Sequence, residues 1–168
     1  VEDGVIVSDC HVGDVEHVSV EGGVLTSIGS DGFIRHWGWA DISEAEGLRA
    51  LECLSEIDTG LVVRSAVRVP SQGEAEREGA WVLSDERGTV CSVDASGERR
   101  VMLSTHSGAA VAARSNRGDV MVTAGACGSV RVWDIIAGRQ VCARMVAEGA
   151  GCTALLRADL DGEERFIV

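Results

Sequence analysis

The sequence predicts an all-β protein built from about three copies of one four-stranded unit, with partial copies at both ends. A pattern repeats at residues 29–37 and 125–133, with Gly, Gly, Arg and Trp at equal offsets. Short runs rich in β-branched residues alternate with turns that contain Gly or Asp, which is typical of strands joined by tight connections. Strong helical periodicity is absent, so strands are the elements that the pattern favours.

The first copy is assigned to residues 11–60. Its turns are the Gly-Gly pair at 22–23 and the Ser-Asp-Gly sequence at 30–32, where positive φ angles are easiest for Gly. Strands are therefore expected at residues 15–20, 24–28 and 33–37. An acidic stretch follows at residues 41–46, with a short helical turn expected within residues 42–54.

The second copy, residues 61–105, is degenerate. It has Val93 and Asp94 at the end of a strand, with no Trp at that position and no upstream loop His. Gly88 precedes Val93 by five positions, the same spacing that separates Gly32 from Trp37 in the first copy. That spacing places the second copy in register with its neighbours.

The third copy is assigned to residues 106–150, and partial copies flank the set at 1–10 and 151–168. Glycines fall in the expected connections of the third copy. Its strands are expected at residues 110–113, 120–124, 129–133 and 140–146. In the last partial copy, residues 151–156 are expected to begin the unit and residues 166–168 to start its next strand.

Trp133 and Asp134 close a strand, and His106 lies 27 residues before the Trp (133−106); His11 and Trp37 are 26 apart (37−11). This arrangement resembles the WD repeat. The resemblance implies one four-stranded blade per copy, and three copies cannot close a ring of four to eight blades. The fold class expected is thus a fragment of a WD-repeat β-propeller, with partial blades at both ends.

The resemblance also implies a buried hydrogen-bond chain formed by a loop His, a strand Ser or Thr, a turn Asp and the strand Trp. Asp31 takes the turn position, six residues before Trp37, whereas Cys127 takes it in the third copy. The third blade is therefore expected to lack the complete chain. The structural positions assigned in this way are His11, Asp31, Trp37, Val93, Asp94, His106, Trp133 and Asp134.

Charge and cysteine usage exclude several classes of function. The net charge is −12, and all 15 basic residues are Arg, so phosphate backbones and anionic membranes are repelled. The sequence contains no run of about 18 apolar residues, which is the length needed to span a bilayer. The six Cys form no CxxC pair, and without a secretory signal they are expected to be reduced thiols.

No catalytic, cofactor-binding or metal site is expected, and no small-molecule substrate. Cys10 and His11 are adjacent, so on a strand they point to opposite faces. The four His show no metal-binding spacing. Acidic loops are the candidate partner-binding surfaces, through Asp41, Glu44, Glu46, Glu74, Glu76 and Glu78. Trp39 and Trp81 are core or interface residues, with core favoured.

Residues 28–45, together with 106–112 and 127–134, resemble the cilia- and flagella-associated WD-repeat proteins. This resemblance implies a structural protein of the motile axoneme, on the reducing cytoplasmic side. Its expected partners are a sibling tether WD-repeat protein, inner-arm dynein heavy chains and the doublet microtubule, with the motor heads tethered to that microtubule.

Two alternatives stay open from the sequence. A general WD-repeat adaptor, in trafficking or ubiquitin ligation, would share the same blade pattern. A hydrolase is a third hypothesis, which one hyper-reactive Cys would favour.

Overall fold

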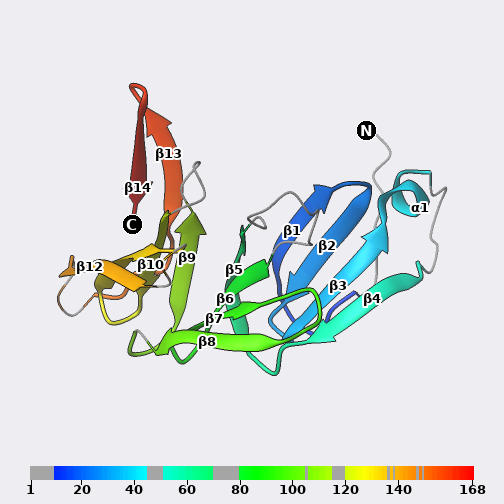
Figure 1. Ribbon diagram of the computed structural model, residues 1–168, viewed down its shortest axis with the longest axis horizontal. Coiled ribbons are helices and arrows are strands. Elements are labelled where there is room, and N and C mark those ends of the chain that lie inside the picture. Colours follow the sequence, from blue (N-terminus) through cyan, green and yellow to red (C-terminus); the bar gives the residue numbers. More distant parts are fainter. Residues whose placement is uncertain are drawn as a thin grey trace. The chain divides into compact units, whose positions relative to one another are not determined.

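The structure is a computed structural model that describes residues 10–44, 51–69, 80–104, 106–114, 120–135, 137, 139–146, 148 and 150–168, with the backbone alone at 100–104 and 114. These residues form three four-stranded antiparallel sheets and one two-stranded hairpin (Figure 1). The chain divides into two compact units, Val1–Val63 and Arg64–Val168. The all-β expectation is confirmed, and the repeated four-stranded sheets are those of a β-propeller fragment.

Sheet A lies in the first unit and has the strand order β1-β2-β3-β4. Its strands are β1 (Val15–Glu21), β2 (Val24–Gly29), β3 (Phe33–Gly38) and β4 (Cys53–Asp58). Between β3 and β4 the chain forms the helix α1 (Trp39–Ser43), earlier in the sequence than the helical turn expected within residues 42–54. Ile42 anchors this helix, because its side chain is buried.

Sheets B and C follow in the chain. Sheet B consists of β5 (Val63–Val69), β6 (Ala80–Asp85), β7 (Thr89–Val93) and β8 (Arg99–Ser104). Sheet C consists of β9 (Ala110–Arg114), β10 (Val120–Gly125), β11 (Ser129–Asp134) and β12 (Arg139–Met145). The second strand of each sheet has consecutive buried residues, so β2, β6 and β10 are covered on both faces over most of their length.

The C-terminal hairpin pairs β13 (Leu156–Leu160) with β14 (Glu163–Ile167). Asp161 and Gly162 have φ angles of 55° and 78°, which is the backbone of a two-residue turn with both central residues left-handed. The strand that was expected to start at residues 166–168 was misplaced. It begins earlier, at Glu163, and ends at Ile167.

A hydrophobic cluster joins sheets B and C. Val82 and Val90 come from β6 and β7, and they pack with Met121 and Trp133, which are paired across β10 and β11. All four side chains are at most 2% exposed. One face of sheet B therefore packs against one face of sheet C, as successive blades of a propeller do.

The same tight turn joins the second and third strands of every sheet. In each turn a Gly has a φ near +80°, and its N–H donates to the carbonyl three residues earlier. The glycines are Gly32 in sheet A, Gly88 in sheet B and Gly128 in sheet C. The carbonyl of the same Gly accepts an N–H from a residue just after the fourth strand, namely Thr59, His106 or Val146.

Candidate functional site

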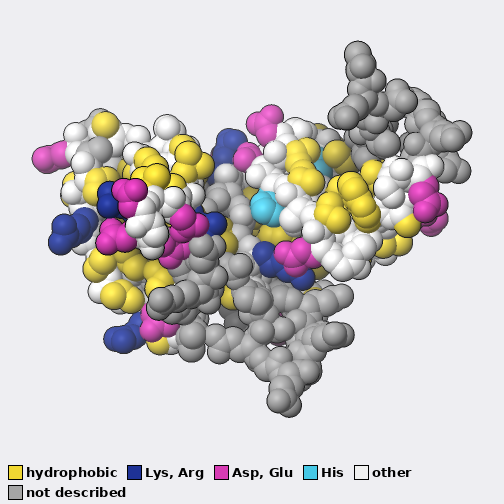
Figure 2. Space-filling view, turned by 90° about the horizontal axis from the view of Figure 1, so that it is seen from above, with side chains coloured by type: hydrophobic (Ala, Val, Ile, Leu, Met, Phe, Trp, Pro, Cys, Tyr) yellow, Lys and Arg dark blue, Asp and Glu magenta, His cyan; other side chains and the backbone are white. Residues whose placement is uncertain are grey.

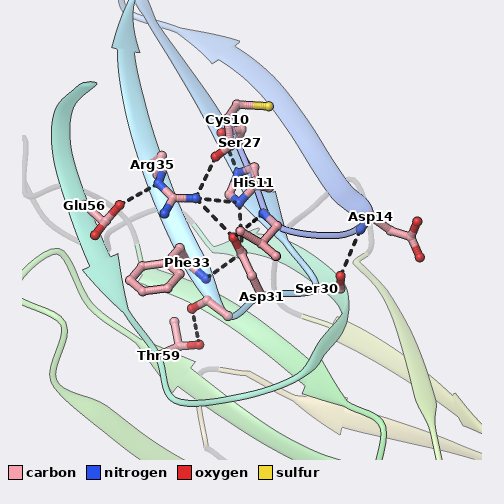
Figure 3. A network of polar contacts seen from close by, with 12 residues as sticks. Cys10, His11, Asp14, Ser27, Ser30, Asp31, Phe33, Arg35, Glu56 and Thr59 are labelled. Carbon is pink, nitrogen blue, oxygen red and sulfur yellow. Dashed lines mark hydrogen bonds and ion pairs between the residues drawn. The ribbon is translucent and has the colours of Figure 1, made fainter. Parts of the chain in front are cut away.

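A hydrogen-bond chain connects the loop before β1 with the strands β2 and β3 of sheet A (Figure 3). The His11 Nε2 lies 2.8 Å from the Ser27 Oγ, and the Trp37 Nε1 donates to the same oxygen at 3.0 Å. On its other side, the His11 Nδ1 lies 2.9 Å from an Asp31 carboxylate oxygen. The structure thus brings His11, Asp31 and Trp37 together, with Ser27 at the centre.

The Asp31 carboxylate accepts from several donors besides His11. The Val12 N–H donates at 2.9 Å, the Phe33 N–H at 3.2 Å, and the Arg35 guanidinium at 3.2 Å. Burial opposes ionisation, but these hydrogen bonds from Val12, His11, Phe33 and Arg35 outweigh it and lower the pKa of Asp31 to about 2. The carboxylate is therefore charged at neutral pH and fixes the turn, the loop and the His.

Arg35 extends the chain to the fourth strand. Its Nη1 donates to the Cys10 carbonyl at 2.6 Å, and its Nε donates to the Glu56 carboxylate on β4 at 2.5 Å. Sequence reasoning gave no role to Arg35 or Ser27. The recurrence of the Arg, at 35 and 131, was a signal that could have found it.

Sheet C keeps most of this chain. The His106 Nε2 lies 2.9 Å from the Thr123 Oγ1, and the Trp133 Nε1 donates to that oxygen at 2.9 Å. The His106 Nδ1 meets the Ser129 Oγ at 3.0 Å and the Cys127 Sγ at 3.6 Å, where sheet A has a carboxylate. The chain from His to Trp is present, and its acidic end is missing.

The imidazole of sheet C is held in its neutral form. Burial, followed by the nearby Arg131 charge, lowers the pKa of His106 to about 4. The His106 side chain is only 6% exposed, so its neutral form is the one that fits this site.

Sheet B replaces the polar chain by apolar packing. Leu83, Cys91 and Val93 are each 0% exposed. The strand pairing puts them at the places that Ser27, Arg35 and Trp37 occupy in sheet A. Burial raises the pKa of the Cys91 thiol to about 11, so this sulfur behaves as a small apolar group.

Asp85 holds the tight turn of sheet B, and sequence reasoning missed it. Its carboxylate accepts the N–H groups of Arg87 and Thr89, at 2.9 and 2.7 Å. The equivalent residue in sheet A is Gly29, where a Cβ atom would overlap the His11 ring. An Asp is compatible with this position in the copy whose sequence has no loop His.

The Asp residues at the ends of the third strands of sheets B and C bind neighbouring backbone. Asp94 accepts the N–H groups of Ser96 and Glu98, each at 2.9 Å. Asp134 accepts the Ala137 N–H at 2.8 Å. Both carboxylates therefore cap the connection to the fourth strand, and neither belongs to the buried chain.

Of the predicted partner-binding residues, Asp41 and Glu44 are exposed at α1. The other four lie outside the described residues, namely Glu46, Glu74, Glu76 and Glu78. Trp81 is 4% exposed and belongs to the core, whereas Trp39 is 40% exposed. Figure 2 shows acidic and hydrophobic side chains interspersed on the face it presents.

Cys10 and His11 form no reactive pair in the hydrogen-bond chain, since Cys10 contributes its carbonyl and His11 is engaged with Ser27 and Asp31. Within the described part of the chain, no three His, Cys, Asp or Glu residues group as metal ligands would. No described helix has the length and apolar character to cross a membrane.

No protein-family model matches this chain. Its sequence is similar to the cilia- and flagella-associated protein 44 of Mus musculus, with 28% identity over 141 residues. The match covers 76% of this chain and 7% of the mouse protein. The chain thus spans a small fraction of the length of that relative.

Proposed function

We propose that this chain is part of a WD-repeat propeller scaffold that works in cilia or flagella. The observation that carries the proposal is the similarity to the mouse cilia- and flagella-associated protein 44. The His–Ser–Trp and His–Thr–Trp chains of sheets A and C support it, because they follow the pattern of the WD repeat. A scaffold of packed sheets offers rigid surfaces to partner proteins.

The proposed role is structural rather than catalytic. The polar groups of sheet A bind one another, so His11 and Asp31 are committed to holding the turn and the loop. A catalytic His or carboxylate needs a face toward a substrate. We propose, as the finer hypothesis, that the whole protein tethers inner-arm dynein motor heads to the doublet microtubule, with a sibling WD-repeat protein as its partner in the axoneme.

Acidic loops are the proposed docking surface. Asp41 and Glu44 stand exposed beside a helix that Ile42 anchors, so a partner can contact their carboxylates without disturbing the sheet. The net charge of −12 favours a partner with a basic surface. Such contacts set orientation and association rate, and salt weakens them.

The first experiment tests the ciliary role. The full-length protein is tagged at its own locus in a ciliated cell and is then deleted. We expect the tag along the axoneme, and after deletion an altered beat frequency or waveform in cilia that still assemble. A tag that stays away from cilia, or normal beating after deletion, would contradict the proposal.

A second experiment tests the acidic surface in the full-length protein. Asp41→Ser and Glu44→Ser, combined with the same change at Glu46, Glu74, Glu76 and Glu78, should weaken axonemal docking while leaving the protein folded. The pair Asp41→Ser and Glu44→Ser is also tested alone, and its matched control changes two other exposed acids, Glu52 and Glu148, to Ser. Equal retention of both variants on axonemes over a salt series would show that docking uses another surface.

A further inference from the structure

Cys127 takes the place of a carboxylate in sheet C. Like Asp31 in sheet A, it lies two residues after the Gly that ends the second strand, and it faces the Nδ1 of the loop His. Both residues also accept the N–H group two positions further on, from Phe33 or Ser129. The Cys127 sulfur in sheet C is therefore surrounded by the same kinds of groups that surround the Asp31 carboxylate in sheet A.

The donors around this sulfur favour its anionic form. The Ser129 hydroxyl lies 3.0 Å from the Cys127 Sγ, and the backbone N–H groups of Ser129 and Ser107 point to the same atom. The Ser129 hydroxyl acts most strongly, and these donors outweigh burial and lower the pKa of the Cys127 thiol. A thiolate is the nucleophilic form of cysteine.

Arg131 occupies in sheet C the position that Arg35 occupies in sheet A, and its charge acts on the His106 imidazole beside Cys127. In sheet A the equivalent Arg35 has its Nε paired with the Glu56 carboxylate. The Arg131 Nε is buried and has no hydrogen-bond partner among the described residues, while its Nη1 donates to Gln140. Sheet C thus keeps the cationic group of the network and lacks both of its carboxylates.

A second cysteine lies beside this turn. The Cys152 N–H donates at 3.1 Å to the carbonyl of Gly125, two residues before Cys127. A Cβ atom on Gly151 would come within 2.9 Å of the Ala126 carbonyl, so the two segments are in close contact. Burial, and then the negative charge of Cys127, raise the pKa of Cys152. Both thiols are partly exposed to solvent.

We propose that Cys127 and Cys152 form a peroxide-responsive thiol pair. In the first step the Cys127 thiolate attacks a peroxide oxygen; an S–O bond forms, the O–O bond breaks, and the hydroxide that leaves takes up a proton to become water. In the second step the Cys152 sulfur attacks the sulfur of the sulfenic acid; an S–S bond forms, the S–O bond breaks, and the hydroxyl group leaves as a second water with the proton of the Cys152 thiol. Two thiols are oxidised while one hydrogen peroxide is reduced to two waters.

The disulfide would join the β10–β11 turn of sheet C to the segment that leads into β13. This segment is held to the turn by the Cys152 N–H and is otherwise largely exposed. A covalent link restricts the separation of the two segments, so it would hold the hairpin on the sheet under oxidising conditions. The modification would thus act on the junction between successive blades.

The test uses the full-length protein and one equivalent of hydrogen peroxide, with thiols then blocked and peptides identified by mass spectrometry. Cys127 should be lost at least about tenfold faster than Cys142, which is exposed on β12. The main product should be a peptide that links Cys127 to Cys152 and that a reductant separates. Buried Cys91 should stay reduced, which shows that the fold is intact.

Two variants sharpen the result. Cys152→Ser should remove the disulfide and let a sulfenic acid accumulate at Cys127, where dimedone traps it. Ser129→Ala should slow the oxidation of Cys127 several-fold, because it removes the hydroxyl nearest the sulfur. The proposal would be overturned if Cys127 were oxidised no faster than Cys142. It would also be overturned if, in the protein without substitutions, Cys127 were oxidised and Cys152 stayed a free thiol.

Discussion

Sheets A and B have the same strand order and the same Gly-containing turn, yet they are held together in opposite ways. Sheet A joins its loop and central strands through Ser27, Asp31 and Arg35, whereas sheet B has Leu83, Cys91 and Val93 packed without exposure. The WD signature therefore indicates the polar hydrogen-bond network and not the blade itself. A four-stranded blade forms with or without that chain.

The two solutions differ in how they tolerate change. A buried polar network is stabilising when each member has its partner, and it becomes costly when one partner is removed. An apolar core has no partners to lose, but it cannot accommodate a polar group. Sheet A should therefore be destabilised most by the loss of a polar partner, and sheet B by the introduction of a polar side chain.

The largest effect is expected when sheet B receives the residue of sheet A. Leu83→Ser leaves a cavity and a hydroxyl without a suitable partner, so unfolding should become easier by about 3–5 kcal/mol. Leu83→Met keeps the volume and should cost less than about 1.5 kcal/mol. Denaturant unfolding of the full-length protein, with hydrogen exchange to locate the change, measures both. A cost below that of Leu83→Met would mean that sheet B has room for polar groups.

Sheets A and C should lose stability at different pH values when the solution is acidified. The folded pKa of His106 is about 4, below the unfolded value near 6.5, so its stabilising contribution is present above pH 6.5 and is lost as pH falls toward 4. That loss is on the order of 3 kcal/mol. Asp31, with a folded pKa of about 2, loses its contribution only between about pH 4 and 2.

Hydrogen exchange over a pH series, corrected for intrinsic rates, measures this order. Amides of β10 and β11 should lose protection between pH 6.5 and 4, before those of β2 and β3. The replacement His106→Gln should remove that pH dependence from sheet C. Loss of protection in sheet A first would contradict the assignment of the two charge states.

A smaller effect is expected at Gly29, the last residue of β2 in sheet A. Gly29→Ala places a methyl group against the His11 ring and should cost about 1–3 kcal/mol. Much of that cost should disappear when His11→Ala is already present, because the ring no longer fills the space. A double-mutant cycle on the free energy of unfolding measures this coupling. Additive costs would show that the backbone, and not the ring, excludes the methyl group.

The acidic end of the chain can be compared directly between sheets A and C. Asp31→Ala leaves His11 and the turn N–H groups without their acceptor, and it should cost about 1–3 kcal/mol. The matched change is Cys127→Ala.

Cys127→Ala gives the smallest effect in the series. The Ser129 hydroxyl already meets the His106 Nδ1, so the cost should stay below about 1 kcal/mol. Thermal unfolding of the two alanine variants under reducing conditions makes the comparison. Equal costs would mean that the sulfur contributes as much as a carboxylate.

Much of sheets A and C could be predicted from the sequence, because their turns and strands are marked by residues with strong local preferences. The strands expected at 24–28 and 129–133 lie within one residue of β2 and β11 at each end. The C-terminal hairpin was misplaced by a few residues. Its turn is marked by Asp161 and Gly162, and the expectation followed the spacing of the repeat instead of that local signal.

The hydrogen-bond network between the side chains was harder to predict. The positions of His11, Asp31 and Trp37 came from the resemblance, whereas Ser27 is one of several Ser or Thr residues on strands, and the sequence does not say which faces the His. Asp85 was missed because its position is Gly in the other two copies. An Asp becomes possible there only through the loss of the His, which is a contact between distant residues.

The carbonyl of the turn Gly has a further consequence for how this protein can change over evolution. The residue whose N–H donates to this carbonyl lies 27 positions after Gly32 in sheet A. The corresponding separation is 18 positions for both Gly88 and Gly128. The surplus lies between β3 and β4, where α1 is inserted, and the chain still returns to the same hydrogen bond. This connection can therefore take additional residues and present new side chains at the surface, such as Asp41 and Glu44, while the hydrogen bond to the turn Gly is retained.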